Sequence, residues 1–430
     1  TQSTWGVSQR LMEKIEEVVI VGAGVAGLAT ALGLYRNGIR CLVLESSTSL
    51  RVTGLAFMTW TNAWKALNAL GIAPLLRKQH LLLQGLSVYT PESDDAGKDL
   101  SFIDHEVRCV RRKLLLEAMT NELPDGAIKF SSKVVSVGDS KYYKIVHLSD
   151  GSIIKTKVMK RNATIFAKTN GDMTQALIGC DGINSVIARS LGFKKLKFSG
   201  RFATRGCAEF DEGHGLENKY QLFIGNGIRL GLIPCDEKFV YWFLTWIPTT
   251  IAKEQEIRTP LELKKFVLKK VESFPELVKR TLEATNLDSI QSVPLHYRSP
   301  WQLWWSSISK GNVCVAGDAM HPMTPDIGQG ACTSLEDAVV LARCLKVAFR
   351  GHCEEVNVSE YQRIEVALKK YGEERRWRCF FVASTALLVG IIQQTNNKLV
   401  CFIRDTLLVK YLSGLLLKSS EFDCGSLKKA

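Results

Sequence analysis

Three glycines near the start of the chain, Gly22, Gly24 and Gly27, have the spacing GxGxxG within the stretch GAGVAG. An apolar stretch precedes them and a helical pattern follows, which predicts a strand, a tight turn and a helix. In such a unit the first glycine permits the turn, the second lets the backbone approach a pyrophosphate, and the third allows close packing of the helix on the strand. The backbone amides of Val25 and Ala26 would lie at the positive end of the helix dipole. This pattern predicts binding of a dinucleotide diphosphate.

A second apolar stretch, IRCLVLE, ends at Glu45 and predicts a parallel strand that completes a βαβ unit. A carboxylate at this position can accept hydrogen bonds from both hydroxyls of an adenosine ribose, and it disfavours a 2′-phosphate. The dinucleotide is therefore expected to be FAD or NAD rather than NADP. A glycine-rich structural turn is the alternative, but the two strands, the helix and the acidic residue together make the pattern specific.

Two further motifs follow later in the chain. In ALIGCDGINSVIARSLG a buried strand is expected to end at Asp181 and Gly182, with a helix after it. The stretch GDAMHPMTPDIGQGACTSLEDA begins at Gly317 and Asp318 and leads into a helical pattern near Ala331. Both motifs place an acidic residue beside a glycine at the expected end of a strand.

These motifs resemble two signatures of one enzyme family. The first, with Ser185 and Arg189, is similar to the DG signature of the group A flavoprotein monooxygenases of the para-hydroxybenzoate hydroxylase type. The second, with Ala319, His321 and Pro322, is similar to the GD signature of that family. Together with GAGVAG they give the family's three landmarks in order. The chain most resembles the plant members of the salicylate-hydroxylase-like, urate-hydroxylase-like and zeaxanthin-epoxidase-like kind.

The resemblance implies that the cofactor is FAD and that the second motif holds the flavin. Asp318 would accept a hydrogen bond from a ribitol hydroxyl, and the loop through Pro325, Gly328 and Gly330 would let a flat ring approach the backbone. The helix that begins near Ala331 would direct its N-terminal amides at the pyrimidine edge of the ring, where negative charge gathers in reduced flavin. The implied cofactor-binding residues are Gly22, Gly24, Val25, Ala26, Gly27, Glu45, Arg51, Arg112, Asp181, Gly182, Gly317, Asp318, Pro325, Gly328 and Gly330.

Several of these side chains have competing interpretations. Arg51 resembles a family residue in the segment after the ribose-binding acid, and Arg112 resembles the arginine near the FAD diphosphate, although both could be surface charges. His321 is expected to stabilise its loop rather than to act as a base. Glu336 and Asp337 could compensate the helix dipole or contact the cofactor. No catalytic residue can be named from the sequence.

The predicted fold is α/β, with a Rossmann-like FAD-binding domain whose parallel sheet carries an antiparallel insert. A mixed-sheet substrate domain is expected where β-branched and aromatic residues alternate, and helices are expected at the end of the chain. The stretch FIGNGIRLGLIP resembles the family's strand pair that borders the substrate pocket, which implies that Phe223, Arg229 and Trp242 line this pocket. The predicted segments are 16–90, 91–200 with the DG motif and 301–350 with the GD motif for FAD binding, 201–300 for the substrate sheet, and 351–430 for the helical tail.

The resemblance implies the activity of an NAD(P)H-consuming monooxygenase. The flavin would accept hydride from NADPH or NADH, form a C4a-hydroperoxide with dioxygen, and hydroxylate a small aromatic or heterocyclic substrate. An epoxidase of an isoprenoid or carotenoid-like lipid and a catalytically weak flavin-binding regulatory protein are the alternatives. The substrate, the choice between NADH and NADPH, and the oligomeric state stay open.

Composition adds limits to this interpretation. The 12 cysteines show no CxxC pair and the 7 histidines show no metal-binding spacing, so neither a metal site nor a disulfide framework is predicted. The net charge of +13 is spread without interleaved stacking aromatics, which disfavours nucleic acid as a partner. The expected location is cytoplasmic, with a plastid or membrane-associated protein as alternatives. The stretch 379–392 is expected to form a buried helix, with an interfacial helix as the alternative, and 407–417 is expected to form an amphipathic helix for which membrane contact is an alternative. Residues 159–176 resemble an insert.

Overall fold

A parallel sheet forms the centre of the first half of the fold. The computed structural model describes residues 17–50, 55–89, 98–139, 143–157, 173–225, 227–248, 259–350, 358–394, 414 and 417–427. The sheet has the strand order β18-β19-β12-β1-β2-β7, and only β18 is antiparallel to its neighbour. Its strands are β1 (Val18–Val21), β2 (Cys41–Leu44), β7 (Ile128–Lys129), β12 (Ala176–Gly179), β18 (Ser309–Lys310) and β19 (Val313–Val315). Every residue of β1 is buried, as expected for the middle of a covered parallel sheet.

Helices cover this sheet and meet one another at close range. Helix α1 (Val25–Arg36) follows β1 and packs against α10 (Gly330–Arg350). A Cβ on Gly33 would lie 2.9 Å from the Cβ of Ala342, so the glycine permits this close crossing. The other helices on this half are α2 (Thr61–Leu70), α3 (Ala73–Gln79), α4 (Arg112–Thr120) and α5 (Val186–Ser190).

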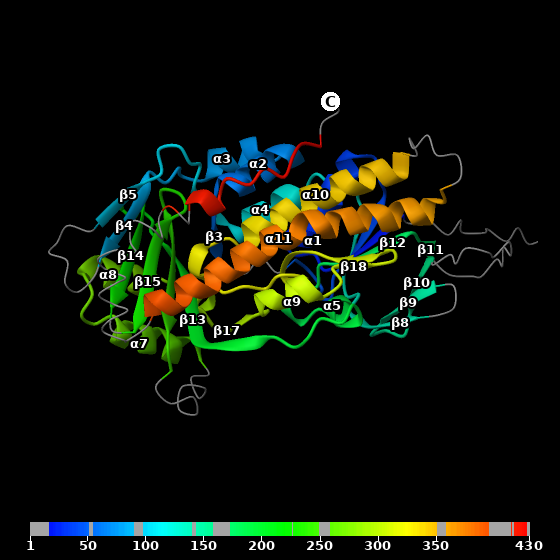
Figure 1. The fold of residues 1–430 in the computed structure, drawn as a ribbon. Coiled ribbons are helices and arrows are strands. Elements are labelled where there is room, and N and C mark those ends of the chain that lie inside the picture. Colours follow the sequence, from blue (N-terminus) through cyan, green and yellow to red (C-terminus); the bar gives the residue numbers. More distant parts are fainter. Residues whose placement is uncertain are drawn as a thin grey trace, which may run out of the picture.

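A larger mixed sheet forms the second half, with the strand order β17-β13-β16-β15-β14-β4-β5. Its strands are β4 (Gly85–Tyr89), β5 (Lys98–Ser101), β13 (Lys197–Glu209), β14 (Lys219–Gly225), β15 (Ile228–Pro234), β16 (Phe239–Trp246) and β17 (Gln291–Tyr297). Helices α7 (Pro260–Lys270) and α8 (Glu276–Glu283) pack on its outer face, and their apolar residues join a separate hydrophobic cluster. Figure 1 shows α7 and α8 beside this sheet, away from the parallel strands.

Two small sheets complete the described strands. The order β11-β10-β9-β8 joins β8 (Val134–Asp139), β9 (Tyr143–Leu148), β10 (Ile153–Lys157) and β11 (Met173–Thr174), and β3 (Ala56–Thr59) pairs with β6 (Arg108–Arg111). Single 3-10 turns occur at η1 (Gly182–Asn184), η2 (Leu287–Ser289), η3 (Gly317–Ala319) and η4 (Pro325–Ile327). Most of the predicted insert, residues 159–172, lies outside the described residues. Strand β12 leads directly to Asp181.

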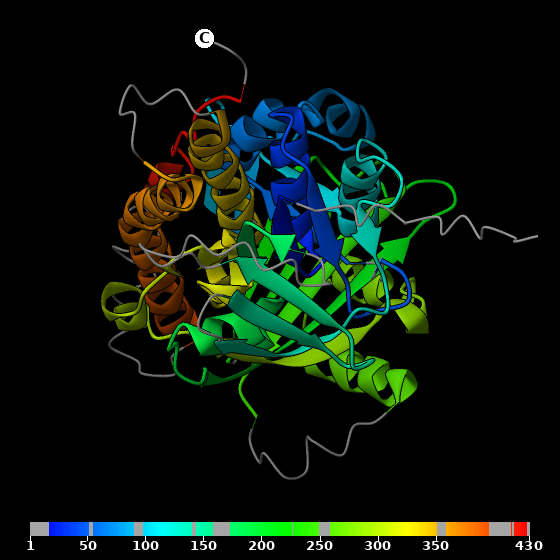
Figure 2. The ribbon, with the colours of Figure 1, turned by 90° about the vertical axis from the view of Figure 1, so that its right-hand side faces the viewer.

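The C-terminal helix α11 (Glu360–Gln394) packs along α10, and the short α9 (Pro300–Trp305) packs against α11. Figure 2 shows these helices on one side of the parallel strands, and α7 on a different side of the molecule. The apolar stretch 379–392 is thus the second half of α11. Among the described helices, none has the length and apolar character needed to cross a membrane. Of the stretch 407–417, only Gly414 and Leu417 are among the described residues.

The α/β fold class is confirmed, with parallel and antiparallel sheets and a helical tail. The predicted division into segments stays a prediction. Strands β4 and β5, which that division assigns to the FAD-binding segments, pair with β14 and with each other in the larger mixed sheet.

Candidate functional site

The glycine turn between β1 and α1 is shaped by close backbone contacts. Gly22 has a φ of +101°, and a Cβ there would lie 2.4 Å from the carbonyl oxygen of Cys180. A Cβ on Gly27 would lie 1.8 Å from the carbonyl oxygen of Gly22, so both positions require glycine. Gly24 differs, because a Cβ there would meet no protein atom within 4 Å. Its open side faces a large cavity that Val25 and Ala26 also line.

The start of α1 has the features of an anion site. Gly24 is the N-cap residue, and no side chain caps the helix. The first amides of a helix lack partners within the helix and carry the positive end of its dipole. Here those amides lie beside the cavity, so a bound diphosphate could accept their hydrogen bonds.

Glu45 holds the glycine turn in place from the end of β2. Its Oε2 accepts a hydrogen bond from the amide of Ala23 at 2.8 Å, and its Oε1 accepts one from the amide of Ser47 at 2.9 Å. Burial opposes ionisation, but these amides outweigh it and hold the pKa of the carboxyl below its ordinary value. The side chain is not part of the cavity wall, so its predicted contact with a ribose stays a prediction.

Replacing Glu45 by Gln is expected to lower the free energy of unfolding at neutral pH by about 1 to 3 kcal/mol, since an amide NH₂ would face a backbone N–H. The wild-type carboxylate contributes stability above its unfolded pKa of 4.5 and loses that contribution as pH falls through its lower folded pKa. Urea unfolding should therefore show a difference between the two proteins that narrows below pH 4.5. The control is Glu122→Gln, which removes a half-exposed pair with Arg36. A pH-independent difference for Glu45→Gln would contradict this account.

Asp181 stands at the end of β12 and uses only one of its carboxylate oxygens. Oδ2 accepts the amide of Val186 at 2.7 Å, while Oδ1 is buried and has no partner among the described residues. Burial raises the pKa of this carboxyl despite the bonds from Ser185 and Val186. A hydroxyl donor from a bound cofactor would satisfy Oδ1. Gly182 and Ile183, which follow, line the cavity.

The GD motif packs directly against the start of α1, since a Cβ on Gly317 would lie 2.6 Å from the Cβ of Ala26. Gly317 has a φ of +60°, and Asp318 lies deep in the protein with its side chain exposed to the cavity. Burial raises the pKa of Asp318, although His321 and the arginines Arg205 and Arg112 oppose that shift. The loop continues through the 3-10 turn η4 to the left-handed Gly328, with a φ of +62°, and the cavity wall includes Pro325, Gly328 and Gly330.

Of the two predicted arginines, Arg112 lies in the cavity wall at the start of α4. Arg51 lies outside the described residues. The same cavity is thus bordered by the glycine turn, the DG motif, the GD loop and Arg112.

His321, Glu336 and Asp337 belong to a buried ionic network instead of the cavity. Nε2 of His321 lies 2.6 Å from Asp337 Oδ2, which also accepts the amide of Gly317 at 2.8 Å. Arg375 of α11 donates to Asp337 Oδ1 and to Glu336 Oε2, both at 2.7 Å. The carboxylates therefore neither compensate the helix dipole nor reach the cavity. The His321 side chain stabilises its loop, as expected.

Burial disfavours the protonated form of His321, but Cys379 and Asp337 outweigh it and hold the pKa of the imidazole well above its ordinary value. His321, Asp337 and Cys379 could offer three ligand atoms to a metal ion, since these atoms lie within 4.8 Å of one another. The Arg375 guanidinium on Asp337 would repel such a cation.

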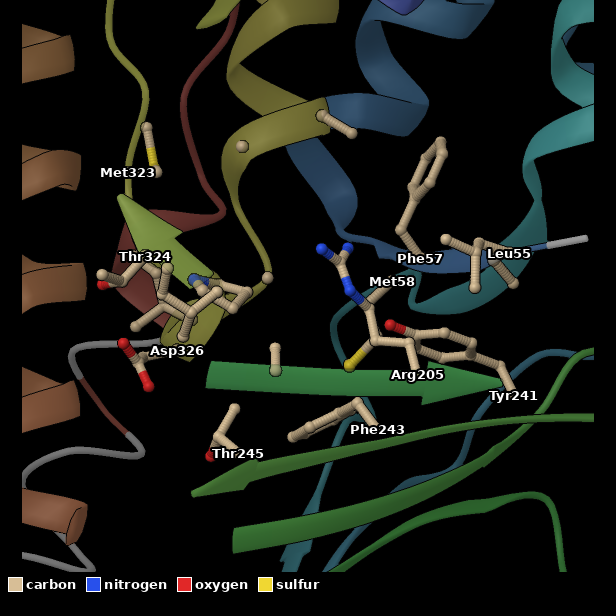
Figure 3. A pocket seen from close by; sticks show the side chains of 18 of the residues that line it. Leu55, Phe57, Met58, Arg205, Tyr241, Phe243, Thr245, Met323, Thr324 and Asp326 are labelled. Atoms are coloured by element: carbon tan, nitrogen blue, oxygen red, sulfur yellow. The ribbon is translucent and has the colours of Figure 1, made fainter. Parts of the chain in front are cut away.

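The cavity has a volume of about 1080 Å³ and extends from the glycine turn to the inner face of the large sheet. Figure 3 shows Tyr241, Phe243 and Thr245 along one strand of this face, with Arg205 beside Tyr241 and the loop through Asp326 across from them. On strands β13 to β16, the residues of this wall that sequence reasoning missed are Ala203, Arg205, Tyr220, Leu222, Ile224, Ile233, Tyr241, Phe243 and Thr245.

Two predicted substrate residues are corrected by the strand register. Side chains alternate between the two faces of a strand, and Tyr241 and Phe243 point into the cavity. Trp242 between them therefore points the other way, into the cluster under α7 and α8, where its Nε1 donates to Thr285. Phe223 lies in the same cluster, between the cavity-lining Leu222 and Ile224. This alternation of side chains along a strand is the sequence signal that could have excluded Trp242 and Phe223 from the pocket wall.

Arg229 does line the cavity, but its guanidinium is already engaged. Nη1 lies 3.3 Å from Asp326 Oδ1, and Nη2 donates to the Asp326 carbonyl oxygen at 3.0 Å and to the Tyr220 hydroxyl at 3.3 Å. Arg201 adds a bidentate pair with the Asp326 carboxylate at 2.9 and 2.7 Å. These two arginines attach the loop at Pro325–Ile327 to the sheet and thereby fix the shape of the cavity.

These features together fit FAD. The uncapped helix start and the open side of Gly24 suit a diphosphate, the unpaired Oδ1 of Asp181 suits a hydroxyl donor, and the GD loop offers backbone to a flat ring. A cavity of this size leaves space beyond the cofactor loops, against the large sheet, for a second molecule.

Comparison with known proteins agrees with this site. Residues 160–370 match the family described as FAD binding domain, and residues 17–180 match the lycopene cyclase protein family. Monooxygenase 2 of Arabidopsis thaliana is 49% identical over 419 residues, which cover 96% of this chain and 98% of that protein. Monooxygenase 1 of the same plant is 33% identical, with 97% and 100% covered. The crystal structure of Klebsiella pneumoniae HpxO with FAD and uric acid has a TM-score of 0.75 at 22% identity, covering 94% of this chain and 96% of that chain, which supports the fold.

The fold and the site therefore define a flavoprotein oxidoreductase. This chain belongs to the family of group A FAD-dependent monooxygenases, and its cofactor is FAD. The two Arabidopsis relatives fit the predicted similarity to plant members.

Proposed function

We propose that the protein hydroxylates a small aromatic or heterocyclic compound with electrons from NADPH or NADH and one oxygen atom from dioxygen. The observation that carries this proposal is a cavity in which the cofactor loops lie on one side and an apolar, aromatic sheet face lies on the other. Relatives with names of this kind support it, among them FAD-dependent urate hydroxylase of Klebsiella pneumoniae at 25% identity and 6-hydroxynicotinate 3-monooxygenase of Pseudomonas fluorescens at 26%.

When bound, FAD supplies the redox chemistry: it accepts hydride from the nicotinamide donor and activates dioxygen. The residues of this chain position the reactants. Leu222, Ile224 and Phe243 give the sheet face an apolar surface that can pack against a flat ring and exclude water. Burial raises the pKa of the Tyr241 phenol, so this side chain stays neutral and can donate a hydrogen bond to a polar substituent.

Arg205 places a positive charge in the same wall. It hydrogen-bonds Tyr241 and lies close enough to Asp318 to oppose the rise in pKa that burial gives that carboxyl. A cation at this position favours a substrate that carries an acidic group or an ionised ring oxygen. Phenolates, purine anions and ring carboxylates are therefore the favoured substrate classes.

Anaerobic stopped-flow reduction of the FAD-loaded protein tests the proposal. NADPH and NADH are each mixed with the protein alone and with a panel of phenolic acids, purines and carotenoids. We expect one aromatic or heterocyclic acid to speed flavin reduction at least about tenfold, equivalent to ~1.4 kcal/mol of barrier. Acceleration by a carotenoid alone would support the isoprenoid epoxidase. FAD that stays bound but is reduced slowly with every ligand would support the weak flavin-binding protein. The cytoplasmic location stays a prediction.

A further inference from the structure

Four tryptophans lie exposed on one surface of α9 and α11. Trp301, Trp304, Trp305 and Trp377 are 63%, 46%, 80% and 61% exposed, and we call them the tryptophan surface. The rings of Trp301, Trp304 and Trp377 cluster around Phe380, with centroid distances to Phe380 of 5.3 Å from Trp301 and 5.5 Å from Trp377, and of 5.9 Å between Trp304 and Trp377. Exposed aromatic clusters of this kind mark interaction sites.

The tryptophan surface is held in its exposed position. Arg376 of α11 donates to the carbonyl oxygens of Leu303, Trp304 and Ser306, the last two at 2.9 and 3.0 Å. These bonds satisfy the C-terminal end of α9 and attach it to α11. The rings therefore stay on the outside of a fixed scaffold.

The apolar surface continues along α11. Leu388 and Ile391 are 52% and 60% exposed, and the sequence from Cys379 to Gln394 contains no charged residue. The opposite side of this half-helix packs against the protein, where Val382, Ala386 and Val389 contact Ile327 of the cofactor loop. Core packing thus accounts for the apolar residues on the inner face of the helix but not for those on its outer face.

Basic side chains border the tryptophan surface. Lys194, Lys195 and Lys197 are exposed. The segment that carries them is tied to α9, since the amide of Lys194 donates to Oε1 of Gln302 at 3.1 Å and Arg298 donates to the Lys194 carbonyl oxygen at 3.1 Å. The nearest exposed acid in sequence to Trp377, Glu373, is paired with Lys369. The segment beside α9 therefore carries positive charge.

We propose that the tryptophan surface docks on an anionic lipid bilayer and holds the protein at the membrane surface. Tryptophan is enriched at the level of the lipid headgroups, where its ring is buried and its N–H stays in contact with water. Lysines beside an apolar face add attraction to anionic lipids. A second copy of the chain fits less well, because a two-fold interface here would bring the same lysines of both copies together. The proposal goes beyond the proposed reaction and does not depend on it.

Vesicle sedimentation tests the proposal with the FAD-loaded protein. Vesicles of phosphatidylcholine are compared with vesicles that contain about 30 mol% phosphatidylserine. We expect binding to the anionic vesicles that weakens with salt, and at least about tenfold weaker binding for the double variant Trp304→Ser/Trp305→Ser. The matched control is Ile103→Ser, which removes a side chain that is 88% exposed between β5 and β6.

A second pair of variants tests the electrostatic contribution of the lysines to vesicle binding. Lys194→Glu/Lys195→Glu should reduce binding to the anionic vesicles, whereas Lys265→Glu/Lys269→Glu on α7, which changes the net charge equally, should retain it. Equal loss in both would show attraction to net charge alone and would overturn docking through this surface. Quenching of wild-type tryptophan fluorescence by lipids with brominated chains gives a readout that needs no variant.

Three results would overturn the proposal. They are the absence of binding to anionic vesicles, binding that Trp304→Ser/Trp305→Ser leaves unchanged, and fluorescence that brominated lipid does not quench. A dimer in sedimentation equilibrium that the tryptophan variant dissociates, without vesicle binding, would assign this surface to a second copy of the chain.

Discussion

Replacement of Arg375 by Met is expected to lower the free energy of unfolding by about 3 to 5 kcal/mol, because it removes the central cation of a buried ionic network. Arg375, Glu336 and Asp337 are all fully buried. Without the guanidinium, Asp337 Oδ1 loses its hydrogen bond from Arg375, and Glu336 keeps its bonds from Arg378 and Asn62. Methionine fills similar volume, so the effect comes from uncompensated charge and not from a cavity. Urea unfolding at neutral pH is the measurement.

The control for this variant lies between the same two helices. Arg343→Met removes a partly exposed ion pair between α10 and α11, Arg343 with Glu374, which should contribute about 1 kcal/mol or less. Arg375→Met should also release FAD more readily, since Asp337 holds the amide of Gly317 directly before Asp318. If the two variants were destabilised equally, the buried network would not be what fixes the GD loop.

The partners in the buried ionic network could not be predicted from the sequence. Glu336 and Asp337 were visible as acids in the first turns of a predicted helix, and dipole compensation was a sound local expectation. Their actual partners, Arg375 and Arg378, come from α11, and nothing in the stretch EERRWR distinguishes a buried arginine from an exposed one. Long-range pairing of charges is set by the packing of α10 on α11, which no local pattern reports.

The parts of the fold with strong local constraints could be predicted. Gly22 and Gly27 are required by contacts within one βαβ unit, so their spacing alone indicates strand, turn and helix. The mixed sheet was also predicted, from alternation in its strands. The cavity wall was not, because the pattern YWF at 241–243 shows three large side chains and does not say which face they share. Only the pairing of β16 with β13 and β15 shows that Tyr241 and Phe243 face inward.

The tryptophan surface could not be predicted from the sequence either. The stretch PWQLWW and the residue Trp377 are far apart in sequence, and each alone is compatible with an ordinary buried helix. The structure makes them neighbours on the outside of the molecule by packing α9 on α11. The sequence offers membrane contact as an alternative for the apolar stretches of the tail, but not for α9, which carries three of the four exposed tryptophans.

Replacement of Gly24 by Ala is expected to lower the affinity for FAD at least about tenfold, equivalent to ~1.4 kcal/mol, with little effect on the protein without cofactor. The backbone of Gly24 has a φ of −78°, which alanine adopts readily, and the added Cβ would meet no protein atom. The loss of glycine at an N-cap should cost less than about 1 kcal/mol of stability. The methyl group would instead occupy the space through which a diphosphate approaches the start of α1.

Gly27→Ala is the informative contrast, since it differs from Gly24→Ala only in what surrounds the new methyl group. Its Cβ would collide with the carbonyl oxygen of Gly22, so the apo-protein itself should be destabilised. Titration of FAD into both apo-proteins, together with their urea unfolding curves, separates a lost cofactor contact from a lost turn. Wild-type affinity in a stable Gly24→Ala protein would mean that the diphosphate does not pass this residue, and the placement of FAD along the glycine turn would have to be abandoned. A selective loss of affinity would place the diphosphate at the start of α1, and the flavin would then extend toward Asp318 and the aromatic face of the large sheet.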